Sequence, residues 1–331
     1  MNHVKIVQDC ATAQLPTHGL ADLSPRDKKW DVHRSATQTV GDIYDQSDRG
    51  TYHRLGDRMC KCANLLLFKE SINPDTGEIG IKLKNAHFCH CRHCPICQWR
   101  KAMRNVARFF DRIPKVMEAY PKGQWLFLTL TVQNPAMPDL RKTLNEMNAA
   151  WKRLIERKDW PAIGYIRATE VTKDKNGNPH PHFHCLLLVR PGYFQGGVYL
   201  AQLDWAINWQ SCLRVDYQPV IDVRKVKSKD GQAGIGAAVV ETLKYAVKAD
   251  DMKDPEFLYG ITEQLRKMRF LATGGVLKNF LTDDDVSDAE MVNTTELGEA
   301  PEAVIDDKPP VMFGWKPNVR KYKKVSAPPL S

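Results

Sequence analysis

The sequence lacks any long run of apolar residues, and this absence limits where the chain can reside. No stretch reaches the roughly 18 consecutive apolar residues that a membrane-spanning helix needs. The first residues, MNHVKIVQDCATAQLPTHG, have no apolar centre like that of a signal peptide. No internal repeat is visible. We therefore expect a soluble, cytoplasmic protein without a membrane partner, and 331 residues are enough for one substantial core.

Acidic residues are unevenly distributed along the chain. Residues 281–310 carry ten Asp/Glu and one Lys, whereas residues 311–331 carry five Lys/Arg and no acid. Subtracting these segments from the formal net charge of +9 leaves +13 for residues 1–280. This excess of positive charge in residues 1–280 favours a polyanion such as nucleic acid as the partner. The alternative is that the basic residues only form a solvated surface and bind no polyanion.

Six of the nine cysteines fall close together, at positions 60, 62, 89, 91, 94 and 97. Thiols in a reducing compartment bind metal or are buried more often than they form disulfides. Cys94 and Cys97 have the spacing of a zinc knuckle, and zinc takes four nitrogen or sulfur ligands. The other clustered cysteines compete with His87, His90 and His93 for the remaining positions. A redox-active Cys-x-x-Cys pair is the alternative, which the further cysteines disfavour.

Periodicity divides the chain into four segments. Residues 1–50 show no sustained pattern, so we expect a loosely ordered segment. Residues 51–115 hold the cysteines and a helix over 98–113, on which four arginines recur every fourth residue and form a basic stripe: Arg100, Arg104, Arg108 and Arg112. Residues 116–280 form the main domain, and residues 281–331 are expected to be an acidic and then basic tail.

The main domain alternates strand and helix patterns. Strands are predicted over 124–133, 162–171, 182–190 and 216–226, and helices over 138–157, 202–213, 235–249 and 254–271. An Asn-Gly pair at 176–177 indicates a hairpin between the second and third strands. This order predicts an α+β fold with a mostly antiparallel central sheet and helices packed on it.

The stretch NPHPHFHCLLLVR at 178–190 places histidines at alternate positions before an apolar run. On a strand, His182 and His184 project from the same face. Glu170 on the preceding strand lies within reach across the hairpin. Two imidazoles and a carboxylate suit a divalent cation such as Mg²⁺ or Mn²⁺ that keeps positions open for substrate. Half-buried polar strand residues are the alternative, and His180 is expected at the surface or behind the ligands.

The stretch VVETLKYAVKAD at 239–250 has a polar helical arc that carries Glu241, Lys244, Tyr245 and Lys248. A tyrosine hydroxyl is a weak nucleophile unless a base, a cation or a metal activates it. Lys248 can stabilise the phenolate and the charge on a phosphorane, and Glu241 can act as a general base. The alternative is a solvated helix face.

These stretches together resemble the HUH endonuclease superfamily, and within it the single-tyrosine replication initiator (Rep) proteins of rolling-circle plasmids. FLTLTV (127–132), HPHFH (180–184), ETLKYAVK (241–248), FCHCRHCPICQWRKA (88–102) and KMRFLATGGVLK (267–278) carry the resemblance over about 55–280. It implies a ferredoxin-like catalytic fold, Tyr245 as nucleophile, and Glu170, His182 and His184 as ligands. It also implies Cys62 and Cys89 as partners of Cys94 and Cys97 around structural Zn²⁺.

The function implied by the resemblance is metal-dependent nicking and joining of plasmid origin DNA. A 5′-phosphotyrosyl intermediate would leave a 3′-OH primer for a host polymerase, which would work with a host helicase. A homodimer is one possible oligomeric state of the protein. We expect DNA contacts from Arg100, Arg104, Arg108 and Lys244. The alternatives are a single-tyrosine transposase or mobilisation relaxase, a zinc-containing nucleic-acid-binding module without catalysis, and a metalloenzyme acting on another substrate.

Overall fold

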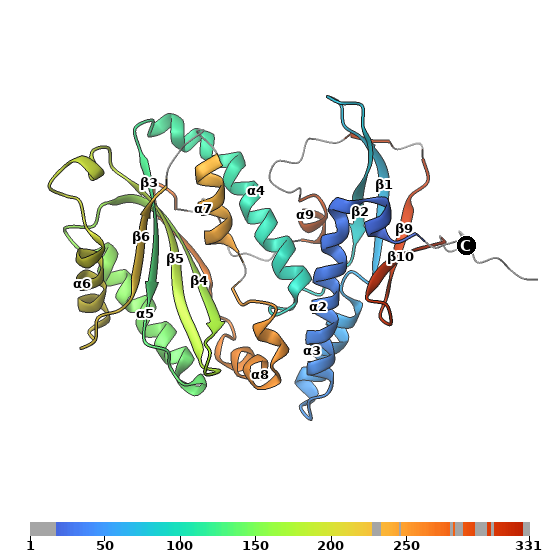
Figure 1. Cartoon of the computed structure of the whole chain (residues 1–331), viewed down its shortest axis with the longest axis horizontal. Coiled ribbons are helices and arrows are strands. Elements are labelled where there is room, and N and C mark those ends of the chain that lie inside the picture. The colour runs from blue at the N-terminus through green and yellow to red at the C-terminus, as the bar shows by residue number, and fades with distance from the viewer. Residues whose placement is uncertain are drawn as a thin grey trace, which may run out of the picture.

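The computed structural model describes residues 18–226, 233–244, 246–278, 281, 287–294, 303–305 and 308–326. They form two antiparallel sheets with helices packed between and around them (Figure 1), which confirms the mixed α+β class. None of the helices found within these ranges is both long and apolar enough to cross a membrane.

The central sheet has the strand order β6-β3-β5-β4-β7, and each neighbouring pair is antiparallel. Its strands are β3 (Gln124–Thr131), β4 (Ala162–Lys173), β5 (Pro179–Val189), β6 (Ile221–Lys225) and β7 (Leu271–Gly275). β4 and β5 form the predicted hairpin, whose turn uses Gly177 at a φ of 86°. Such a φ suits glycine because it has no Cβ. The order from β3 to the helix after β6 matches the predicted one.

One face of the central sheet is covered by α5 (Leu140–Ile155) and α6 (Gln202–Leu213) (Figure 1). The buried residues of α5 recur at helical spacing: Leu140, Leu144, Met147, Trp151 and Leu154. The Trp151 ring meets Phe183 of β5 edge-on, with ring centroids 6.3 Å apart. Alternate residues of β5 therefore belong to the core beneath these two helices.

The opposite face is covered by α4 (Pro95–Ala119) and α7 (Ala233–Leu243) (Figure 1). Leu186 and Leu188 of β5 pack there in one cluster with Phe109 of α4 and Val239 of α7. Because side chains alternate along a strand, His182 and His184 share the face of these leucines. The imidazoles thus stand at the end of a face that the helices cover.

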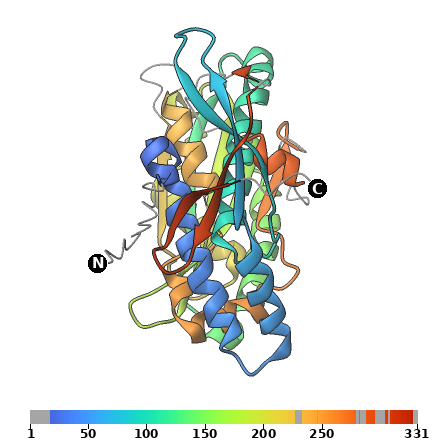
Figure 2. The ribbon, with the colours of Figure 1, turned by 90° about the vertical axis from the view of Figure 1, so that its right-hand side faces the viewer.

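The second sheet joins segments that are far apart in the sequence (Figure 2). Its order is β10-β9-β1-β2, and β8 also pairs with β1; the strands are β1 (Leu65–Ile72), β2 (Ile79–Ala86), β8 (Ala303–Val304), β9 (Val311–Lys316) and β10 (Lys321–Val325). The prediction of a tail over 281–331 is wrong for β9, because this strand pairs with β1 and buries Phe313 and Trp315.

The N-terminal segment also differs from the loosely ordered one expected for residues 1–50. Residues 1–17 lie outside the described ranges, but α1 (Leu20–Leu23) and α2 (Lys28–Asp45) follow, and α3 (Gly50–Lys61) precedes β1. α2 buries Trp30, Val40 and Tyr44. These apolar positions are held by contacts with distant elements; Tyr44, for example, lies near Tyr259 of α8 (Pro255–Gln264), with ring centroids 6.4 Å apart.

Three predicted element boundaries need correction. The strand expected over 216–226 is formed only at Ile221–Lys225; Pro219 has no N–H for a ladder. The helix expected over 254–271 is α8, which ends at Gln264; Lys267 then adopts a φ of 60° and the chain enters β7. The helix expected over 235–249 ends at Leu243.

Candidate active site and metal centres

Three side chains converge at one end of the central sheet. Glu170 of β4 is the direct cross-strand partner of His182 in β5, and His184 lies two residues further along the same face of β5. All three residues are buried. The structure therefore brings together the carboxylate and both imidazoles that the sequence analysis selected, through the register of the hairpin.

The three ligand atoms lie close enough for one cation. The Glu170 Oε2 atom lies 3.2 Å from His182 Nε2 and 2.9 Å from His184 Nε2, and the two Nε2 atoms are 3.1 Å apart. Ligand atoms about 2.1 Å from a cation and at right angles around it are about 3 Å apart. Two nitrogens and one oxygen in this arrangement fit a divalent cation with open coordination positions.

Neighbouring groups orient both imidazoles through contacts with their Nδ1 atoms, on the side of each ring away from the cluster. His182 Nδ1 donates to the His180 carbonyl at 3.1 Å, so a neutral ring has Nε2 available for a cation, whereas a protonated Nε2 donates to Glu170. His184 Nδ1 lies 3.2 Å from Thr129 Oγ1 on β3. Such contacts fix ring orientation in metal sites. No local pattern in the sequence indicates Thr129, since only the pairing of β3 with β5 places it opposite His184.

The charge balance of the cluster keeps Glu170 ionised. Burial alone would raise the pKa of this carboxyl, but hydrogen bonds from His182 and His184 and the positive charge of Lys244 together hold the pKa well below its usual range. An ionised carboxylate is the form that binds a cation. The carboxylate of this donor set is therefore available for a metal at neutral pH.

The chain that leaves α7 runs directly past Glu170. Lys244 Nζ lies 3.2 Å from Glu170 Oε2 and 2.6 Å from Glu241 Oε1. Two residues later, the Ala246 carbonyl accepts a 2.8 Å hydrogen bond from the backbone N–H of Val171. Tyr245 itself lies outside the described residues. Both of its described neighbours are thus fixed to β4 beside the candidate metal site.

The remaining residues of the predicted polar arc are placed differently from expectation. Because α7 ends at Leu243, Glu241 and Lys248 do not share one continuous helix face. Glu241 is exposed and pairs with Lys244, and Lys248 is exposed beyond the helix. The periodicity of 239–250 could not reveal this, because the hydrogen bond that holds Ala246 comes from a distant strand. Their chemical roles stay predictions.

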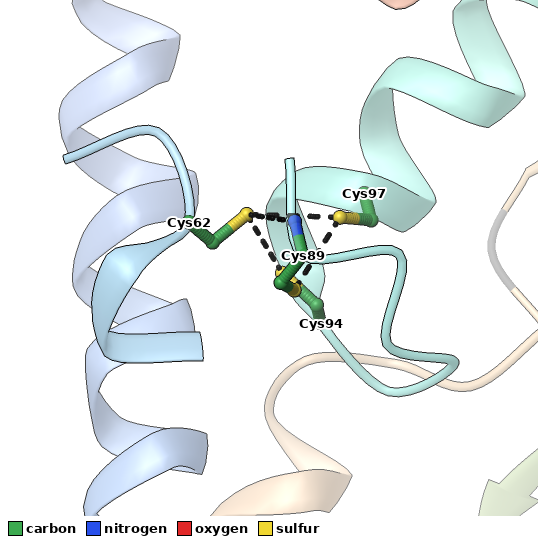
Figure 3. Close-up of side chains that lie close together, drawn as sticks. All are labelled: Cys62, Cys89, Cys94 and Cys97. Atoms are coloured by element: carbon green, nitrogen blue, oxygen red, sulfur yellow. Dashed lines mark hydrogen bonds between the residues drawn. The ribbon is translucent and has the colours of Figure 1, made fainter. Parts of the chain in front are cut away.

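A second group consists of four buried cysteine sulfurs (Figure 3). Cys62 follows α3, Cys89 follows β2, and Cys94 and Cys97 lie at the start of α4. The sulfur atoms are separated by 3.6 Å for Cys62–Cys97, 3.7 Å for Cys89–Cys97 and 3.6 Å for Cys94–Cys62. A tetrahedron with zinc–sulfur bonds of about 2.3 Å has edges of about 3.8 Å. The four sulfurs therefore fit one zinc ion.

These four cysteines differ in their contacts from the other cysteines and histidines close to them in the sequence. Burial opposes ionisation of Cys94, but hydrogen bonds from the other three thiols hold its pKa well below the usual range. The Thr37 hydroxyl, 3.6 Å from Cys94 Sγ, adds a polar contact. Cys60 is exposed and Cys91 lies outside the group, and so do His87, His90 and His93. The structure therefore groups four of the six clustered cysteines, and zinc binding by these four stays a prediction.

Three of the four arginines of the basic stripe on α4 contact a short helix: Arg100, Arg104 and Arg108. Arg100 and Arg104 are only 4% and 5% exposed. Arg100 donates to the Met291 and Thr294 carbonyls at the end of α9 (Asp288–Val292), at 2.7 and 2.8 Å. Arg104 and Arg108 both pair with Glu290. These arginines therefore hold α9 against α4, and their DNA contacts stay a prediction that requires α9 to move away.

Comparison with known proteins places the chain in a family. A family model described as Replication protein matches residues 80–323. A protein named Protein rep from Bacillus amyloliquefaciens is 31% identical, over 82% of this chain and 85% of that protein. Another of the same name from Lactiplantibacillus plantarum is 35% identical, over 74% of this chain and 82% of its own length. A third, from Streptococcus pneumoniae serotype 2, is 30% identical over 82% of this chain and 85% of its own.

The chain belongs to this replication protein family, since the family model spans more than half of it. The membership confirms the predicted resemblance to plasmid replication initiator (Rep) proteins. The matched range includes the histidine and carboxylate group, three of the four cysteines and the segment after α7. No solved structure gives a significant match to the chain.

Proposed function

We propose that this chain nicks and rejoins single-stranded DNA at a plasmid replication origin, with Tyr245 as the nucleophile. The observation that carries the proposal is the position of the chain around Tyr245: Lys244 contacts Glu170, and the Ala246 carbonyl accepts from Val171. The strand order β6-β3-β5-β4-β7, with the histidines on the middle strand, supports an HUH-type, ferredoxin-like catalytic domain.

In the proposed reaction, the Tyr245 oxygen attacks the scissile phosphorus in line with the 3′-oxygen that leaves. A tyrosine O–P bond forms and the P–O3′ bond breaks, so the products are a 5′-phosphotyrosyl adduct and a free 3′-OH. Lys248 stabilises the phenolate and the developing negative charge. The cation that Glu170, His182 and His184 would hold, Mg²⁺ or Mn²⁺, supplies polarisation of the phosphate oxygen when bound.

Completion of the cycle needs a group that acts after Tyr245 has been consumed. We assign this role to Glu241, which accepts a proton from a water or from a DNA 3′-hydroxyl as that oxygen attacks the adduct. The free 3′-OH from the first step would prime a host polymerase, with a host helicase separating the strands. The four cysteines would hold structural Zn²⁺, which fixes the start of α4 against β2 and α3.

Covalent capture from a randomised pool of single-stranded oligonucleotides tests the proposal for any nick-site sequence. The pool carries a label at its 3′ end and is incubated with the protein and Mn²⁺, and a parallel pool carries the label at its 5′ end. We expect denaturation-resistant label on the protein only from the 3′-labelled pool, because Tyr245 keeps the 5′-phosphate of the downstream fragment. Absence of an adduct from both pools contradicts the proposal.

A further inference from the structure

A cavity of about 270 Å³ lies beside the candidate active site, between α4 and the segment that follows α7. Lys244 belongs to its wall and also contacts Glu170 at 3.2 Å. Ala168 of β4, another wall residue, is the cross-strand partner of His184. The cavity therefore adjoins the metal-binding group and is separate from the atoms that would hold the cation.

The wall of the cavity is positively charged. Arg92, Lys101 and Lys244 line it, and the described lining residues include no Asp or Glu. This is notable because Met291 of α9, within the strongly acidic segment 281–310, also lines it. Lys244 is also paired with Glu170 and Glu241, which lie outside the lining. A concave lining with three cations and no acid of its own favours a polyanionic ligand such as a nucleic-acid backbone.

The same wall offers an apolar surface and amide groups that suit a nucleobase. Phe270, Leu243 and Leu271 line one part, and the Arg92 guanidinium lies over the Phe270 ring at 4.8 Å from its centroid. Gln98 and Asn105 of α4 add side-chain amides. Gln98 Oε1 is buried and has no hydrogen-bond partner among the described atoms, while its Nε2 donates to the Arg92 carbonyl. An unsatisfied buried acceptor favours a ligand with an N–H group.

We propose that this cavity receives one unpaired base of the single-stranded DNA, from a nucleotide near the scissile phosphate. The proposal rests on the proposed function, which brings single-stranded DNA to Glu170, His182 and His184. The volume lies just below the range of about 300–1,000 Å³ typical of pockets for drug-sized ligands, which suits a single base. Stacking and amide contacts would hold the base, while Lys101 and Lys244 contact phosphates.

Filling the cavity is the direct test. Ala102 lines it from α4, is half-buried and is not a candidate ligand, so Ala102→Phe adds a ring to the cavity and leaves every candidate ligand in place. The probes are oligothymidylate and an oligonucleotide of equal length made of abasic units, which has the same phosphates and no bases. Binding of both is measured by fluorescence anisotropy without added divalent cation. Ala149→Phe, at an exposed position of α5 outside the lining of the cavity, is the control.

We expect the wild type and Ala149→Phe to prefer oligothymidylate by at least about fivefold, the contribution of stacking one base. Ala102→Phe should lose that preference and bind the abasic probe like the wild type. A wild type without preference for bases overturns the proposal, as does Ala102→Phe with the full preference. Zinc content and melting temperature show whether Ala102→Phe is folded.

A second variant keeps the test decisive if Ala102→Phe does not fold. Phe270→Ala removes the aromatic surface and should lower the preference for bases in the same direction; an unchanged preference overturns the proposal. Covalent capture by the wild type separates this inference from the proposed function. An adduct without any base preference contradicts the cavity alone, whereas a preference lost in the variants without an adduct contradicts the nicking activity alone.

Discussion

Lys244 reaches across from the end of α7 to Glu170 in β4, with 3.2 Å between Nζ and Oε2. The contact ties the residue before Tyr245 to the carboxylate of the candidate metal site. Burial would lower the pKa of Lys244, but its bond with Glu241 and the charge of Glu170 raise it, so the side chain stays cationic at neutral pH. We therefore expect this ion pair to position the tyrosine segment.

Lys244→Gln should slow adduct formation by about tenfold, corresponding to about 1.4 kcal/mol of lost transition-state positioning. The substitution keeps much of the length of the side chain and removes the charge that Glu170 attracts. Lys253→Gln is the control, since Lys253 forms an exposed pair with Asp250. Single-turnover rates of the two variants are compared, and equal rates show that Lys244 does not position the segment.

His182→Ala and His184→Ala should each lower Mn²⁺-dependent nicking by more than about a hundredfold, because each removes one ligand nitrogen. Calorimetric titration should show weakened Mn²⁺ binding in both. His180→Ala is the control: this ring pairs with Asn134 and lies outside the ligand group. If both ligand variants bind Mn²⁺ as tightly as the His180 variant, the assigned site is wrong.

Cys62→Ser and Cys94→Ser should each lose about one zinc per chain and lower the melting temperature, because structural zinc contributes to folding. Cys60→Ser should keep its zinc, since Cys60 is exposed and outside the four-sulfur group. Elemental analysis of freshly purified protein measures the metal. Wild-type protein without zinc contradicts the assignment, and zinc loss in Cys60→Ser would change the ligand set.

Glu241→Ala should leave the first nicking step largely intact and impair the step that releases the adduct, so that products longer than unit length accumulate in a replication assay. The free energy of unfolding should change by less than about 0.5 kcal/mol, because the pair with Lys244 is largely exposed. Identical product lengths for the wild type and the variant would restrict Glu241 to its ion pair with Lys244.

Local patterns in the sequence were sufficient to predict the hairpin and the grouping of Glu170, His182 and His184 on it. Alternation placed His182 and His184 on one face, and the Asn-Gly turn set the register that brings Glu170 opposite His182. The spacing of Cys94 and Cys97 likewise indicated the pair of cysteines most typical of a zinc knuckle. In both groups, the decisive information lies within a few residues or across one hairpin, where strand geometry leaves few choices.

Long-range contacts determine the features that the sequence did not predict. α7 ends at Leu243 because the following chain hydrogen-bonds to β4, and no residue pattern near 239–250 contains that strand. The acidic segment looks like a solvated tail by composition, yet Glu290 pairs with Arg104. β9 likewise pairs with β1 although most of the chain separates them.

The most direct test of the central claim replaces the hydroxyl of Tyr245. Tyr245→Phe and Tyr217→Phe are compared with the wild type in covalent capture with the 3′-labelled randomised pool and Mn²⁺. Tyr217 is the control because its hydroxyl accepts from the Gln133 N–H, just beyond the end of β3. We predict that only Tyr245→Phe loses the adduct while it still binds single-stranded DNA. An adduct that persists in Tyr245→Phe contradicts the account, because another residue would then be the nucleophile.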